Sequence, residues 1–96
     1  MIAAVVLAAA ITIAHGTVKN FELHAPAAGS EPRSVRVYLP PTYDMYGARR
    51  RRYPTVILLH GWPGSEEDWF EKGEITRIAD EMIASGQMPE VILVVP

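Results

Sequence analysis

The fold is predicted from one segment of the chain, Thr55-Val56-Ile57-Leu58-Leu59-His60-Gly61-Trp62-Pro63-Gly64-Ser65. Residues 55–59 are almost all apolar, and an apolar run this short predicts a buried strand. Gly61 and Gly64 follow within a few residues and predict a tight loop, because glycine accepts backbone conformations that other residues avoid. The segment therefore predicts a strand that ends in a glycine-containing loop.

A helix and a second strand are predicted downstream of this loop. Apolar residues recur with the i, i+3, i+4, i+7, i+8 spacing of a helix with one buried face: Ile75, Ile78, Ala79, Met82 and Ile83. The same spacing predicts that four residues face water: Thr76, Arg77, Asp80 and Glu81. Gly86 is placed to end the helix, and residues 91–95 predict a second buried strand. Together these elements form a βαβ unit, whose ligands bind beyond the carboxyl ends of the strands, where residues 60–64 lie.

An antiparallel hairpin is predicted upstream. Residues 17–24 predict its first strand, and residues 25–33, with two prolines, a glycine and a serine, predict a loop. Residues 34–39 alternate between an apolar face of Val35, Val37 and Leu39 and an outer face of Ser34, Arg36 and Tyr38. This alternation is typical of a half-buried strand. Pro40-Pro41 ends it, because proline cannot donate to a sheet ladder.

The first sixteen residues are expected to be a secretory signal peptide. Residues 2–14 are almost wholly apolar, and they are too few to span a bilayer, which needs roughly 20 apolar residues. Small residues at Ala14 and Gly16 offer two cleavage positions, although no Lys or Arg precedes the apolar run. A buried strand, a buried helix or a truncated start are the alternatives. A signal peptide implies a secreted or periplasmic protein.

Composition excludes several classes of function. The net charge of −2 gives no electrostatic reason to expect a nucleic-acid partner. The run Arg49-Arg50-Arg51-Arg52 could suggest nucleic acid or anionic lipid, but a solvated loop is the favoured interpretation. The absence of cysteine excludes disulfides and a cysteine nucleophile. Metal-ligand spacings are absent as well, so no metal or organic cofactor is expected.

Three segments together resemble the α/β-hydrolase superfamily. They are Val37-Tyr38-Leu39-Pro40-Pro41-Thr42-Tyr43-Asp44, Arg52-Tyr53-Pro54, and residues 58–69 with His60-Gly61, Gly64 and Asp68-Trp69. More narrowly, they resemble the esterase group that contains esterase D, feruloyl esterases and mycolyltransferases. The resemblance covers residues 21–96. It implies that residues 17–96 are the N-terminal part of an α/β-hydrolase domain that acts on a small-molecule ester.

The resemblance also implies roles for residues of the loop. In this fold one backbone N–H after the third strand stabilises the negative charge that acyl transfer builds on a carbonyl oxygen. That residue would be Trp62, acting through its main chain while its side chain packs against a neighbouring loop. His60, Gly61 and Gly64 would shape the loop, with His60 orienting it by hydrogen bonding. His15 and His24 have no partner pattern and are interpreted as incidental.

The chain lacks the rest of an esterase site. No G-x-S-x-G occurs, and neither an acid nor a histidine stands where this fold completes its triad. A single helix also covers one sheet face only, so the predicted domain is expected to be incomplete and the chain inactive alone. The alternatives are an epoxide hydrolase-like fragment, a non-catalytic module that binds a partner through its sheet edge, and a small domain completed by oligomerisation. The oligomeric state is not predicted.

Overall fold

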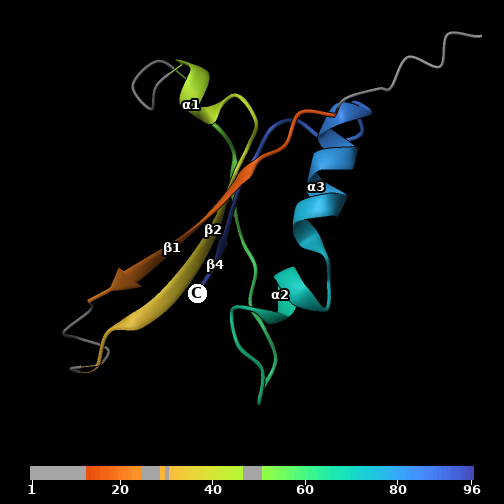
Figure 1. Cartoon of the computed structure of the whole chain (residues 1–96). Helices are drawn as coiled ribbons and strands as arrows, with labels where there is room; N and C mark the ends of the chain where they lie inside the picture. The colour runs from red at the N-terminus through yellow and green to blue at the C-terminus, as the bar shows by residue number, and fades with distance from the viewer. Residues whose placement is uncertain (1–12, 25–28, 30, 47–50) are drawn as a thin grey trace, which may run out of the picture.

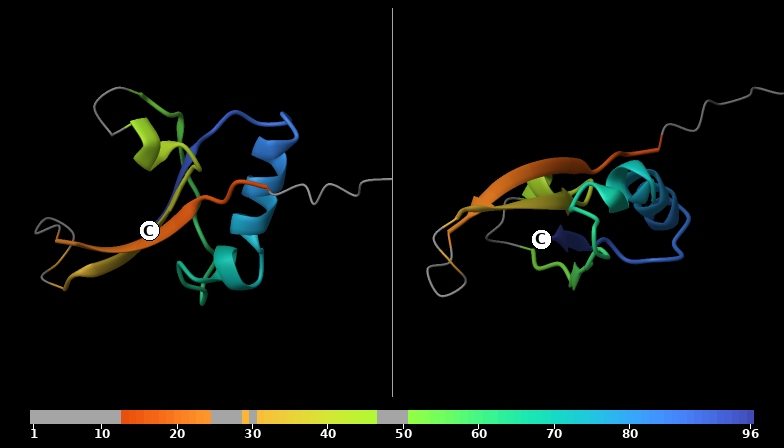
Figure 2. Two further views of the ribbon diagram at one scale, coloured as in Figure 1. Left: turned by 45° about the horizontal axis from the view of Figure 1, so that its top comes forward. Right: turned by 90° about the horizontal axis from the view of Figure 1, so that it is seen from below.

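The computed structural model describes residues 13–24, 29, 31–46 and 51–96. Along the chain they form β1 (Thr17–Leu23), β2 (Arg33–Leu39), α1 (Tyr43–Tyr46), β3 (Thr55–Ile57), α2 (Asp68–Glu71), α3 (Ile75–Ala84) and β4 (Ile92–Val95). Figure 1 shows one mixed sheet with α2 and α3 on the same side of it, and both views of Figure 2 agree. The order of elements is the hairpin followed by a βαβ unit that the sequence predicts.

The four described strands lie in the order β1-β2-β4-β3. β1 and β2 pair antiparallel, with Thr17 opposite Leu39 and Leu23 opposite Arg33. β2 also pairs antiparallel with β4, whereas β3 and β4 are parallel. Hydrogen bonds from Leu58 N to Val94 O and from Ile92 N to Pro54 O extend the β3–β4 pairing at both ends. The predicted hairpin and the predicted parallel pair are both confirmed.

The core consists of two apolar clusters, one on each face of the sheet. The first lies under α3 and is built on Tyr38, Ala79, Val91 and Leu93. The second, on the opposite face, is built on Val35, Val37 and Leu39. The sequence predicts the second cluster correctly but places Tyr38 on an outer face, which is wrong. Tyr38 is fully buried at 0% exposure, because α3 covers the face of β2 on which its ring lies.

The prediction that β3 is buried is also wrong for the described residues. All three of its residues are exposed, and Val56 and Ile57 have 41% and 64% of their surface accessible. β3 is the outermost strand in the sheet order and pairs only with β4 among the described strands. A strand at an edge keeps one side open to solvent however apolar its sequence is.

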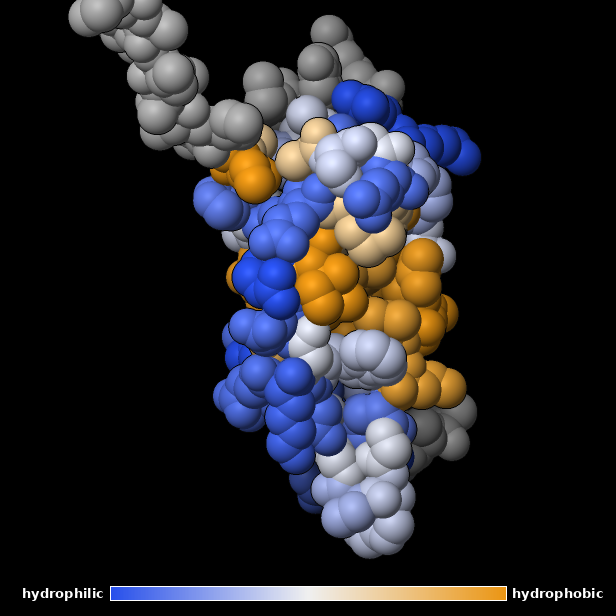
Figure 3. Space-filling model, turned by 90° about the vertical axis from the view of Figure 1, so that its right-hand side faces the viewer, coloured by the Kyte–Doolittle hydropathy of each residue, from blue (hydrophilic) through white to orange (hydrophobic). Residues whose placement is uncertain are grey.

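Helix α3 is confirmed, with one exception to its predicted pattern. Gly86, at φ 75°, follows the helix end in the left-handed conformation predicted for a C-terminal stop. Ala79 is buried, while the other residues of the apolar stripe are half-buried. Figure 3 looks onto this side of the molecule and shows an apolar area beside a polar one. Asp80, predicted to face water, is instead buried at 4% exposure.

The predicted signal peptide, residues 1–16, lies mostly outside the described residues, which begin at Ile13. Two of the four predicted loop arginines, Arg49 and Arg50, lie outside them as well. Among the helices that the structure describes, none is long and apolar enough to cross a bilayer.

Candidate active site

The loop after β3 lies at the carboxyl end of the strand and is not helical. Residues 58–61 carry no regular secondary structure, and a turn follows at 62 and 63. The Trp62–Pro63 peptide bond is cis. The Trp62 side chain is 96% exposed, so the predicted packing against a neighbouring loop is not found in the described chain. The loop bounds a surface hollow of about 330 Å³, lined by Gly61, Trp62, Pro63, Gly64, Ser65, Asp68 and Lys72.

Two hydrogen bonds hold the loop from inside and from the side. The Gly64 N–H donates to the Gly61 carbonyl at 2.6 Å and closes the turn. The indole Nε1–H of Trp69, in α2, donates to the carbonyl of Leu59 at 3.1 Å. Leu59 is the second residue after the end of β3, so this bond fixes the start of the loop.

Close packing explains the glycine at position 64. A Cβ atom placed there would lie 2.7 Å from the Gly61 carbonyl and would collide with the Asp68 carboxylate. A Cβ at Gly61 would meet no atom within 4 Å in the described part of the chain. Gly64 is therefore required sterically, whereas nothing in the described residues crowds Gly61.

Two side-chain hydrogen bonds stabilise the residues that follow the loop. The Ser65 hydroxyl accepts from the Glu67 N–H at 3.3 Å, and the Ser65 N–H donates to the Asp68 carboxylate at 3.3 Å. A turn at residues 66 and 67 leads into α2, and these bonds fix the far end of the loop.

Two polar groups of the loop, the His60 ring and the Trp62 N–H, differ in their hydrogen bonding. The Nδ1 atom of His60 lies 2.9 Å from the Gly61 carbonyl, close enough for an Nδ1–H to donate. The Trp62 N–H has no hydrogen-bond partner within residues 13–24, 29, 31–46 and 51–96. A main-chain N–H in an exposed loop after a strand can donate to a ligand oxygen, and negative charge on that oxygen strengthens the bond.

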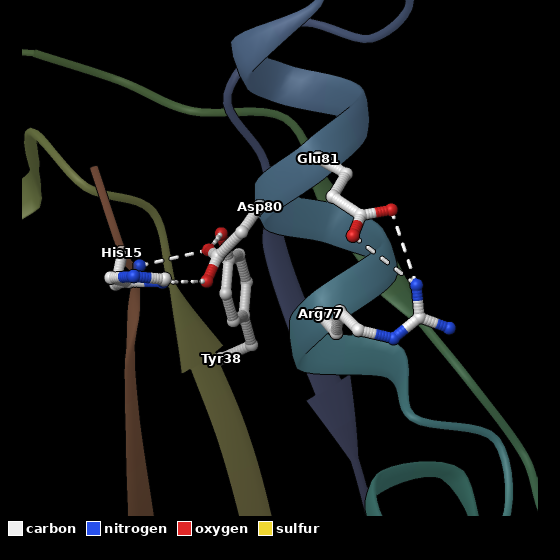
Figure 4. A network of polar contacts seen from close by, with 6 residues as sticks. His15, Tyr38, Arg77, Asp80 and Glu81 are labelled. Carbon is white, nitrogen blue, oxygen red and sulfur yellow. Dashed lines mark hydrogen bonds and ion pairs between the residues drawn. The ribbon is translucent and has the colours of Figure 1, made fainter. Parts of the chain in front are cut away.

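A second polar cluster, around Asp80, was missed by the sequence analysis. The Tyr38 hydroxyl donates to Asp80 Oδ1 at 2.7 Å, and the Gly16 N–H donates to the same oxygen at 2.9 Å. The Nδ1 atom of His15 lies 3.0 Å from Oδ2. Figure 4 shows the carboxylate pointing from α3 toward the strands, away from the Arg77–Glu81 pair on the helix surface. His15, interpreted as incidental, therefore has a partner.

Hydrogen bonds, rather than burial, decide the direction in which the pKa of Asp80 shifts. Burial by itself would raise the pKa of the Asp80 carboxyl, but donation from Gly16, Tyr38 and His15 outweighs it and lowers the pKa. Burial, and then the bond to Asp80, raises the pKa of the Tyr38 hydroxyl. Asp80 is therefore an ionised structural anchor that joins the start of β1 to β2 and α3.

No group of three or more His, Asp or Glu side chains in the described ranges is arranged to hold a metal ion.

The comparisons with known proteins agree on one class. The family model described as "Putative esterase" matches residues 27–96. The endo-1,4-beta-xylanase/feruloyl esterase of Xylanibacter ruminicola is 31% identical over 83 residues, which cover 85% of this chain and 11% of that protein. A solved ferulic acid esterase superposes with a TM-score of 0.78 at 28% identity, over 85% of this chain and 31% of the other. The ferulic acid esterase of Anaeromyces mucronatus, solved in complex with ferulic acid, gives a TM-score of 0.72 at 27% identity, over 85% and 28%.

The mixed sheet and its helices are the N-terminal portion of an α/β-hydrolase esterase fold, and the chain spans less than a third of the length of these relatives. The chain belongs to the esterase family whose model it matches over residues 27–96.

Proposed function

We propose that residues 17–96 are the N-terminal part of a serine ester hydrolase, and that they supply one main-chain donor of its oxyanion hole. The donor is the Trp62 N–H. The observation that carries this proposal is its position, since it follows the end of β3 in an exposed loop and has no partner among the described residues.

The chemistry requires a donor of this kind. Attack of a serine on an ester carbonyl places negative charge on the carbonyl oxygen, and a fixed donor stabilises that charge more in the transition state than in the ground state. One such donor is worth about 2.7–4 kcal/mol in a measured protease. The serine, its histidine base and the acid that orients the histidine would come from sequence outside this chain, and the ester would pass through an acyl-enzyme.

The proposed substrates are esters of aromatic acids of the ferulate type. This proposal rests on the relatives, three of which are described as feruloyl or ferulic acid esterases. The hollow beside Trp62 and Gly64 is open to solvent and bears an exposed indole. An aromatic acyl group could stack on that indole, because aromatic rings favour offset or edge-to-face contact.

We further propose that the protein is exported from the cytoplasm. Residues 1–16 carry the apolar run and the small residues of a signal peptide, so the mature protein would act outside the cytoplasm.

This proposal is tested by sequencing and by an activity assay. The reading frame beyond Pro96 is sequenced, and the complete protein is tested on methyl ferulate. A serine in a nucleophile elbow and turnover that a serine-directed phosphonate abolishes are expected, while the 96-residue chain alone should hydrolyse nothing above buffer. An aspartate in the elbow with epoxide turnover would favour the epoxide hydrolase alternative, and the absence of both residues would favour the binding module.

A further inference from the structure

The N-terminal segment of the described chain is hydrogen-bonded to the rest of the fold, although the sequence places it at the end of a signal peptide. His15 and Gly16 precede β1, yet both contact Asp80 on α3, at 3.0 Å and 2.9 Å. Two cleavage positions are available from the sequence, after Ala14 and after Gly16. The structure gives these two positions very different consequences.

The glycine at position 16 has a structural explanation. A Cβ atom at this position would collide with the Tyr38 ring and would lie 2.5 Å from the Leu39 carbonyl. Only glycine lets the chain pass this close to β2 while its N–H reaches the Asp80 carboxylate. The small residue at 16 is therefore accounted for by packing, and it does not need a protease to explain it.

Ala14 has no such explanation. Its side chain is exposed, and no hydrogen bond in the described residues involves it. A signal peptidase requires small residues at the positions before its cut, and Thr12-Ile13-Ala14 offers a small residue at the last position and a compact one two residues earlier. Ala14 borders a surface hollow together with Ile83 and Met88, and its small side chain meets the requirement of the protease for the position before the cut.

The chemistry of Asp80 separates the two cuts further. Cleavage after Gly16 would remove both the Gly16 N–H and the His15 ring and would leave the buried carboxylate with Tyr38 as its side-chain donor. Cleavage after Ala14 keeps both donors. It also creates an α-ammonium group on His15, the residue whose ring lies 3.0 Å from the carboxylate, and a positive charge on this residue attracts the ionised carboxylate.

We infer that the export leader is cut between Ala14 and His15, so that the mature protein begins with His15 and holds its own N-terminus on Asp80. This inference rests on the export leader proposed above, and it is independent of the esterase proposal.

The test uses the full 96-residue chain with a C-terminal affinity tag, expressed in a secreting bacterium. Pulse labelling and immediate capture through the tag keep the result independent of later degradation, and mass spectrometry identifies the first residue. A chain that begins at His15 is expected. A chain that begins at Thr17 or at another residue overturns the inference while the leader stands, and an uncut chain overturns both.

Two matched variants sharpen the result, because processing precedes folding. Ala14→Leu puts a bulky residue directly before the expected cut and should abolish processing to His15. Gly16→Leu puts the same residue before the alternative cut and should leave processing to His15 unchanged. Loss of all processing in both variants would place the cut after Gly16, because Ala14 is the small residue two positions before Gly16.

Discussion

Replacing Asp80 with alanine tests whether the buried carboxylate anchors the fold. The substitution leaves the Tyr38 hydroxyl and the Gly16 N–H without their shared acceptor, Oδ1. Hydrogen bonds to a charged group contribute about 1.5–3 kcal/mol each, so two buried bonds give a loss of about 3 kcal/mol at the lower end. The His15 contact adds little, since that side chain is 76% exposed. The helix propensity of alanine returns up to about 0.7 kcal/mol.

Replacing Asp80 with asparagine should destabilise the fold less than replacing it with alanine. Its amide oxygen can take the place of Oδ1 and accept from both Tyr38 and Gly16, but without the charge. Charge-assisted bonds are roughly twice as strong as neutral ones, so Asp80→Asn should lose about half as much as Asp80→Ala. Both losses are measured by urea unfolding of the purified chain, followed by circular dichroism. Asp44→Ala removes an exposed carboxylate in α1 and should change the unfolding free energy by less than about 0.5 kcal/mol.

The pH dependence follows from the lowered pKa of Asp80. A carboxyl whose folded pKa lies below its unfolded value of about 3.9 contributes its full stability above that pH. The contribution is lost as the pH falls through the folded pKa. The gap between the native chain and Asp80→Ala should therefore be constant above about pH 4 and shrink below it. An Asp80→Ala variant as stable as Asp44→Ala, or a gap that persists unchanged at low pH, would refute the anchor.

Four further substitutions test the loop and the helix end by urea unfolding. Gly64→Ala should lower the free energy of unfolding by about 1–3 kcal/mol through overpacking. Gly61→Ala should leave it unchanged, because a Cβ there meets nothing within 4 Å in the described residues. Equal losses in the two variants would contradict the steric role of Gly64. Trp69→Phe removes the donor to the Leu59 carbonyl. It should lower the free energy of unfolding by about 1 kcal/mol and speed amide hydrogen exchange in the loop after β3. Unchanged exchange would show that this bond does not stabilise the loop. Gly86→Ala should cost about 1–2 kcal/mol because its φ is positive, and a neutral effect would show that the helix end adapts.

The sequence predicts the backbone arrangement well because its signals are local. The alternation at residues 34–39, the helical spacing from Ile75 and the stop at Gly86 each depend on neighbouring residues only. The hairpin, the parallel strand pair and α3 are accordingly found where these patterns predict them. The loop after β3 is likewise outside any helix, as predicted.

The errors arise where a residue's partner is distant in sequence. Asp80 lies 42 residues from Tyr38 and 65 from His15, and no local pattern links the three. A helical wheel places Asp80 between Thr76 and Ala84, about 100° from Ala79 and outside the apolar stripe, so the local pattern gives no sign that it is buried. β3 was predicted to be buried from its composition, but its burial depends on its place at the edge of the described sheet.

The role of the Trp62 amide is tested most directly by removing that N–H alone. In the complete protein, the peptide bond between Gly61 and Trp62 is replaced by an ester, which deletes the donor and keeps the side chain. Hydrolysis of methyl ferulate is then measured, with Trp62→Ala as the matched control that keeps the N–H and loses the indole.

If the Trp62 N–H is an oxyanion donor, the ester-linked protein loses roughly 100- to 1,000-fold in kcat, while Trp62→Ala keeps a kcat within a few-fold of the native value. A kcat that survives the loss of the N–H would contradict the proposed oxyanion donor.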